Sequence, residues 1–91
     1  MHSVRWNKEA RLDLVSIVDY VAQYNQIAAN KLHETLSQAA ERLASMPYAF
    51  RPGRVTGTRE YVVLPNYILV YRVGEAVIDI LGVLHSRKEY P

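Results

Sequence analysis

The spacing of apolar residues in the first half of the chain predicts two helices joined by a short turn. Apolar residues recur at helical spacing from Ala10 to Val21, and Asn7 precedes them as a suitable N-cap. We expect this first helix to end near Gln23. A second series has the steps 3, 4, 3, 4 and 3 of a narrow helix–helix seam (Ala29, Leu32, Leu36, Ala39, Leu43 and Met46). Pro47 should end the second helix, so the two form a hairpin.

Three segments of the second half show the pattern of β-strands. They cover residues 58–64, 67–73 and 76–85, and Pro65-Asn66 and Val73-Gly74-Glu75 supply the turns between them. Such short connections predict three consecutive antiparallel strands. Ser3–Trp6 also alternates polar and apolar residues, and we interpret it as a short first strand.

Both faces of this predicted sheet are largely apolar. In the last strand one face should carry Ile78, Ile80 and Leu84, and the other Val77, Asp79, Leu81, Val83 and His85. The helical hairpin can cover one face, and nothing obvious in the chain covers the other. An uncovered apolar face of this kind suggests a binding surface.

These elements predict an α+β fold in a single domain over residues 1–91. A short N-terminal strand and an antiparallel two-helix hairpin should pack with a three- to four-stranded antiparallel sheet, and residues 47–57, with two prolines and two glycines, should form a loop. A chain of 91 residues buries a modest share of its surface and has no cysteine to crosslink it. A partner that covers apolar surface would therefore add stability.

Several classes of function are disfavoured by the composition. The chain has no Cys/His cluster for a metal, and no glycine loop, nucleophile elbow or paired-carboxylate site. We therefore expect no metal and no cofactor. The first residues lack the apolar run of a signal peptide, and the longest apolar stretches are too short to cross a bilayer, so we expect a cytoplasmic protein without a membrane partner.

Positive charge gathers in two places, although the formal net charge is only +2. No acid accompanies Arg51 and Arg54 in the predicted loop, and Arg59 follows at the start of the first meander strand. Arg87 and Lys88 lie near the C-terminus. We expect positive potential at the loop and at the tail. Arginines in loops such as Arg51 and Arg54 are more often solvated charges than ligands, and Arg59 could pair with a carboxylate elsewhere.

His85 is the residue with the clearest chemical potential. The meander is expected to bring Arg59, Arg72, His85 and Arg87 within reach of one another. An imidazole titrates near neutral pH and can act as acid or base, with Arg87 to stabilise a phosphate and Tyr90 to donate a proton or stack on a base. These are the residue types of metal-free RNA cleavage. A histidine at a strand end can equally face solvent without a chemical role.

The whole chain resembles the toxins of the RelE/ParE superfamily. The resemblance rests on the order of strand, helical hairpin and meander and on these segments: Trp6 before the first helix, Gly57-Thr-Arg-Glu60, Tyr67-Ile-Leu-Val-Tyr-Arg72 and Val83-Leu-His-Ser-Arg87. It implies the toxin of a bacterial type II toxin–antitoxin pair, associated with growth inhibition and plasmid maintenance. A small ParD- or RelB-like antitoxin would wrap and neutralise it in a hetero-oligomer.

The superfamily divides by target. RelE-like members cleave mRNA on the ribosome, and ParE-like members poison DNA gyrase. His85 matches a histidine of YafQ- and YoeB-like nucleases, but Ile68 stands where RelE has an arginine, and Asn66 where a YafQ-like aspartate would be. The Gly57–Glu60 and Val83–His85 segments look more like ParE.

The sequence therefore favours a ParE-like gyrase inhibitor over a ribosome-dependent endoribonuclease or a non-toxic binding module of the same fold. As a gyrase inhibitor, the chain would dock through its basic residues (Arg51, Arg54, Arg59, Arg87 and Lys88). As a nuclease, it would use a different set (His85, Arg59, Arg87 and Tyr90). In either case the antitoxin would bind the open sheet face (Ile68, Val70, Leu81 and Val83).

Overall fold

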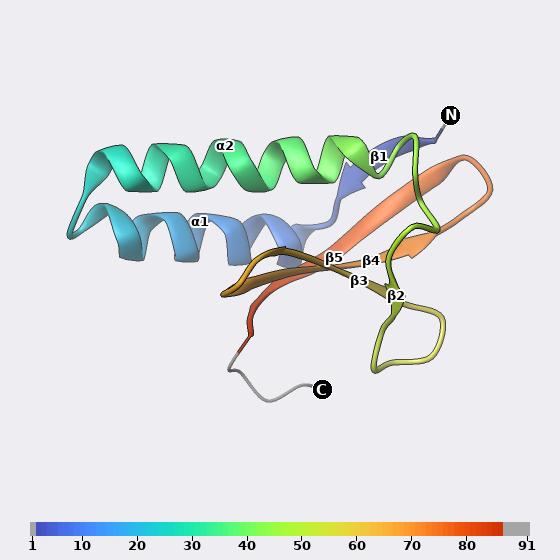
Figure 1. The fold of residues 1–91 in the computed structure, drawn as a ribbon. Coiled ribbons are helices and arrows are strands. Elements are labelled where there is room, and N and C mark those ends of the chain that lie inside the picture. The colour runs from blue at the N-terminus through green and yellow to red at the C-terminus, as the bar shows by residue number, and fades with distance from the viewer. Residues whose placement is uncertain (1, 87–91) are drawn as a thin grey trace.

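A computed structural model describes residues 2–86 of the chain. Helix α1 spans Lys8–Ala22 and helix α2 spans Gln26–Arg42. Each begins at an asparagine whose side chain accepts a backbone N–H three residues later, Asn7 from Ala10 and Asn25 from Ala28. The predicted helical hairpin is confirmed. The two helices lie side by side in one layer, and the sheet forms the second layer (Figure 1).

The predicted meander is also present, within a larger sheet. Strands β3 (Arg59–Leu64), β4 (Tyr67–Val73) and β5 (Val77–His85) pair antiparallel in sequence order. Strand β1 (Ser3–Trp6) joins the far side of β5, and β2 (Arg51–Pro52) joins the outer side of β3. The strand order is β1-β5-β4-β3-β2.

The sheet differs from the prediction in strand number and direction. It has five strands and is mixed, because β1 runs parallel to β5. Residues 51–52, predicted as loop, form β2. The parallel strands β1 and β5 need a long connection, which here contains both helices and two strands of the meander. Strand β2, with only two residues, is too short to show an alternating pattern. Neither pairing leaves a signal in the local sequence.

A bulge in β5 changes which side chains face the helices. Val70 pairs with Gly82 but Tyr71 pairs with Ile80, so Leu81 is an extra residue. The prediction that Ile80 and Leu84 share a face is therefore wrong. Beyond the bulge it is Val83 that joins Ile78 and Ile80 in the core below the helices.

The edge of β5 is completed by α1. Strand β1 pairs only with residues 77–80, and farther along β5 the N–H of Val83 donates to Asp13 Oδ2 at 3.0 Å. A side-chain Cβ at position 82 would come within 3.1 Å of the same carboxylate oxygen. Gly82 thus allows α1 to approach the strand closely.

The core lies between the helices and one face of the sheet. Its fully buried larger side chains come from α2 and its end, β4 and β5 (Leu36, Leu43, Leu69, Tyr71, Ile78 and Ile80). The hydroxyl of Tyr71 donates to Pro47 O at 2.8 Å. Burial raises the pKa of this phenol, although the Arg59 guanidinium acts in the opposite direction. Helix α2 ends at Arg42, earlier than predicted, and Met46 beyond it is exposed rather than part of the seam.

We expect Ile78→Ala to lower the free energy of unfolding by about 2–5 kcal/mol, because it opens a cavity at a fully buried position. The matched change Ile27→Ala, at a side chain that is 81% exposed, should stay within about 0.5 kcal/mol. Urea unfolding followed by Trp6 fluorescence measures both. Equal effects of the two changes would contradict this assignment of the core.

Candidate functional site

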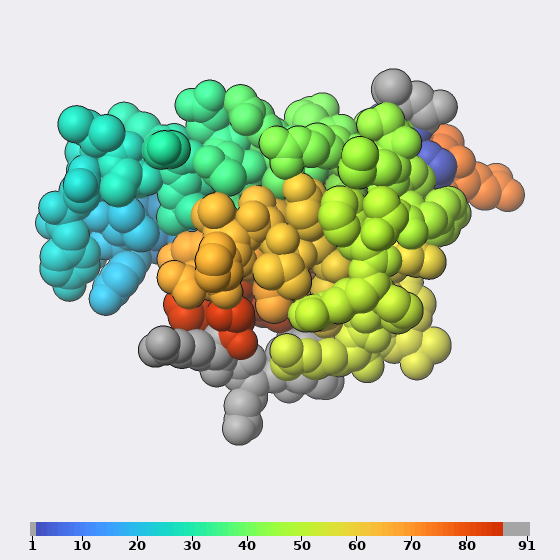
Figure 2. All heavy atoms as spheres, in the orientation of Figure 1, coloured from blue at the N-terminus to red at the C-terminus, as the bar shows by residue number. Residues whose placement is uncertain are grey.

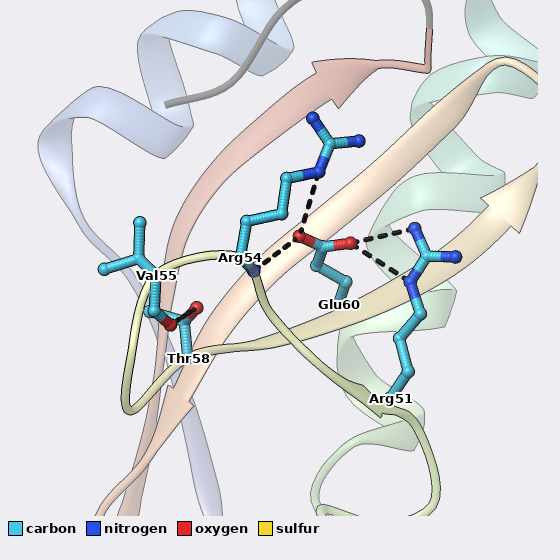
Figure 3. A network of polar contacts seen from close by, with 5 residues as sticks. All are labelled: Arg51, Arg54, Val55, Thr58 and Glu60. Carbon is cyan, nitrogen blue, oxygen red and sulfur yellow. Dashed lines mark hydrogen bonds and ion pairs between the residues drawn. The ribbon is translucent and has the colours of Figure 1, made fainter.

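A buried carboxylate organises the basic loop that precedes the meander. Glu60 is only 3% exposed, and Arg51 reaches its Oε1 with Nε at 3.1 Å and Nη2 at 2.8 Å. The backbone N–H of Arg54 donates to Oε2 at 3.2 Å, and the Arg54 Nε lies 4.0 Å from the same oxygen (Figure 3). Two of the predicted docking arginines therefore hold the loop in place through one acid.

The loop has backbone contacts that fix its path. The N–H of Gly53 donates to Thr58 O at 2.7 Å, and the Thr58 hydroxyl donates to Val55 O at 2.6 Å (Figure 3). A Cβ at Gly53 would collide with Thr58 Oγ1, and Gly57 has a φ of 85°. The segment that follows α2 covers one end of the sheet, seen as yellow-green spheres beside the golden β3 (Figure 2).

Arg59 lies on the other face of β3 from Glu60. Its Nη1 donates to Phe50 O at 2.7 Å, and its guanidinium carbon lies 5.0 Å from the centroid of the exposed Tyr48 ring. Among the described residues, the partners of the Arg59 guanidinium are thus the backbone carbonyls of Phe50 and Tyr48 and the Tyr48 ring, rather than a carboxylate.

The structure separates the residues that the meander was expected to gather. Arg59 pairs with Tyr71, whereas His85 pairs with Tyr67. Four residue steps of β4 lie between these pairs, about 13 Å at a rise of about 3.3 Å per residue. Arg72 is the next residue after Tyr71 and therefore points to the opposite face of β4. The expectation that Arg59, Arg72 and His85 lie within reach of one another is wrong.

His85 sits against α1. Its ring meets the Tyr67 ring edge-on with centroids 5.5 Å apart. A shallow cavity of about 200 Å³ is lined by His85 with Val83 and, from α1, Asp13, Ser16 and Ile17. The half-buried imidazole therefore faces a helix flank that carries one carboxylate and one hydroxyl, and neither Arg51, Arg54 nor Arg59 lines this cavity.

Arg87, Lys88 and Tyr90 lie outside the described residues, so their predicted roles remain predictions. Within residues 2–86, no group of three or more His, Cys, Asp or Glu side chains could hold a metal ion. Within the same part of the chain, no helix is long and apolar enough to cross a membrane.

The sheet face away from the helices is less open than predicted. Ile68 and Val70 lie on it but are buried, and Val83 belongs to the core under the helices. Leu81 is half-buried, at the bulge. It lines a groove of about 270 Å³ between α1 and the loop, together with Val55, Val70, Gly82, Leu84, Thr58, Arg72, Glu9 and Asp13. Of the four residues predicted to meet an antitoxin, Leu81 is the one that is not buried.

Arg72 and Glu60 are the site residues whose surroundings the sequence did not reveal. The Asp79 carboxylate on the neighbouring strand binds Arg5 at 2.8 Å, and the guanidinium of Arg72 forms no hydrogen bond or ion pair with the described residues. Alternation along the strand places Glu60 and Arg59 on opposite faces, and it does not by itself give Glu60 a partner. One signal was available, since Glu60 is the only acid between Glu41 and Glu75 and stands beside three loop arginines.

Comparison with known proteins gives consistent matches over nearly the whole chain. The family model described as the ParE toxin of the type II toxin–antitoxin system parDE matches residues 4–90. The chain is 34% identical over 88 residues to Toxin RelE2 of Caulobacter vibrioides, which covers 97% of this chain and 99% of that protein. It is also 34% identical over 89 residues to Putative toxin Y4kP of Sinorhizobium fredii, with 97% and 92% covered. A solved chain of the chromosomal ParDE system of P. aeruginosa superposes with a TM-score of 0.83 at 26% identity, covering 93% of this chain and 96% of that one.

We expect Glu60→Gln to destabilise the protein by about 1–3 kcal/mol, because an amide cannot accept from Arg51 and from the Arg54 N–H as a carboxylate does. Tryptic cleavage after Arg54 should become faster, while Arg51 stays resistant because proline follows it. Glu75→Gln makes the same change at an exposed turn, and it should neither destabilise the protein nor speed up cleavage after Arg54. Unchanged unfolding and cleavage in Glu60→Gln would show that the carboxylate does not hold the loop.

Proposed function

Since this chain belongs to the ParE toxin family of type II toxin–antitoxin systems, we propose that it inhibits DNA gyrase until its antitoxin neutralises it. The antitoxin partner follows from the family. The choice of gyrase rests on the resemblance of the Gly57–Glu60 and Val83–His85 segments to ParE and on the arrangement of the charged side chains.

The separation of His85 from Arg59 is the observation that carries this proposal. Metal-free cleavage of RNA needs an acid or base and a cation around one phosphate. Within residues 2–86, the candidates for these two roles are His85 and Arg59, which lie about 13 Å apart along the sheet and contact different elements. Docking on a protein has no such requirement, because its contacts can be spread over a surface.

The docking surface that we propose is the loop built around Glu60, with Arg51, Arg54 and Arg59, and with Arg87 and Lys88 from the tail. Glu60 holds the loop in one conformation before any target arrives, which lowers the entropy cost of binding. The exposed Tyr48 ring under the Arg59 guanidinium offers an aromatic and a cationic group together, a combination enriched at interfaces.

For the antitoxin, we propose the groove that contains Leu81. Apolar side chains (Val55, Val70, Leu81 and Leu84) line it together with the charged side chains of Glu9, Asp13 and Arg72. In the conformation described, Val83 is buried in the core and would support the groove from below rather than contact the antitoxin.

The second candidate is ribosome-dependent mRNA cleavage, favoured by the position of His85 beside the Asp13 carboxylate and the Ser16 hydroxyl. The third, a non-toxic binding module, predicts no effect on growth.

One purified preparation can separate these functions. We expect it to inhibit DNA supercoiling by gyrase and to leave mRNA intact on ribosomes, and His85→Ala should keep most of the gyrase inhibition. Cleavage of mRNA that disappears in His85→Ala would instead establish the nuclease. If expression without the antitoxin leaves growth unaffected, both toxin functions are excluded.

We expect Arg54→Gln to raise the concentration needed for half-inhibition of gyrase about tenfold, the effect of removing one interface arginine. The fold should persist, since the backbone N–H of Arg54 still donates to Glu60. Lys31→Gln, an exposed cation on α2, is the matched control. Equal inhibition by Arg54→Gln and the wild type would remove Arg54 from the docking surface.

A further inference from the structure

Helix α1 carries an apolar stripe on the side that faces away from the core. Its inner face packs through Ala10 and Leu14. On the outer face Leu12 is 57% exposed and Val15 is 56% exposed, where a surface helix would ordinarily be polar. Neither side chain belongs to the hydrophobic core or packs against it.

The outward stripe has the spacing of a coiled-coil seam. Positions 8, 12, 15 and 19 follow one another in steps of 4, 3 and 4, and all four residues are exposed (Lys8, Leu12, Val15 and Asp19). Helix α2 and the sheet lie on other sides of α1, so a second helix could approach this seam (Figure 1). The order along the seam is basic, apolar, apolar, acidic.

This order is self-complementary in one orientation only. We propose that the seam binds the α1 helix of a second copy of this chain, antiparallel and about a two-fold axis. Lys8 then faces the partner's Asp19, Leu12 faces the partner's Val15, and the two-fold axis repeats both contacts. A parallel pair would place lysine against lysine and aspartate against aspartate, which costs free energy.

The seam then has four layers of contact. The two middle layers pair Leu12 with Val15 and remove exposed apolar side chains from water, and the two outer layers pair Lys8 with Asp19 and select the orientation. With one helix from each protomer the interface is small compared with a standard one, so the dimer should be weak and form in the range of tens of micromolar. The proposal does not depend on gyrase as the target and can fail or hold independently of it.

Sedimentation velocity of the full chain tests the proposal, with Lys8→Glu and Asp19→Lys as variants. We expect the wild type to form a dimer at about 100 µM, and each variant alone to associate at least about tenfold more weakly, because like charges meet in both outer layers. Each change also places its new charge favourably toward the helix dipole, so loss of the dimer would not reflect a weaker helix.

An equimolar mixture of Lys8→Glu and Asp19→Lys should restore the dimer, since both outer layers then pair an acid with a lysine. Lys31→Glu and Glu34→Lys, exposed changes on α2, are the matched controls and should dimerise like the wild type. Leu12→Gln should abolish association while the circular dichroism spectrum stays unchanged. A wild type that stays monomeric at about 500 µM, or a mixture no better associated than its components, would overturn the proposal.

Discussion

The fold depends on how β5 is held along its two edges. Strand β4 accompanies it along one edge, while β1 covers only the first four residues of the other, and the Asp13 carboxylate accepts the Val83 N–H beyond that point. This bond joins the helical layer to the sheet, and Gly82 leaves room for it. The bulge at Leu81 lies just before the bond and turns Val83 into the core. The position of His85 beside α1 follows from the same arrangement.

The periodic part of the fold could be predicted from the sequence. Apolar residues at helical spacing and the two asparagine caps define α1 and α2, and alternation with turn residues defines the meander. The direction of β1 and the existence of β2 could not be derived, because pairing over long sequence distances leaves no local pattern. The bulge was missed because one extra residue looks like ordinary alternation until its neighbour strand is known.

The candidate site was predicted in part. The residue types were recognised, but their grouping was not, because the faces and registers of three strands decide which side chains meet. The sequence suggests that Arg51 and Arg54 point outward as solvated or docking charges. In the structure both lie beside the buried carboxylate of Glu60 on β3. An arginine that serves the fold in this way can also lie at a binding surface. A basic loop without acids of its own is therefore an incomplete guide to what its arginines do.

The pairing of β1 with β5 also has a consequence for biosynthesis. Arg5 and its ion-pair partner Asp79 are 74 residues apart in sequence, and every β1 contact in the sheet has a similar separation. At roughly 5–20 residues per second, several seconds pass between the synthesis of the two strands. Until β5 leaves the ribosome, β1 and α1 have no complete sheet to join, so the fold of the nascent chain stays incomplete until β5 has been made and released from the tunnel. An antitoxin translated beforehand would thus meet the protein as soon as it can fold.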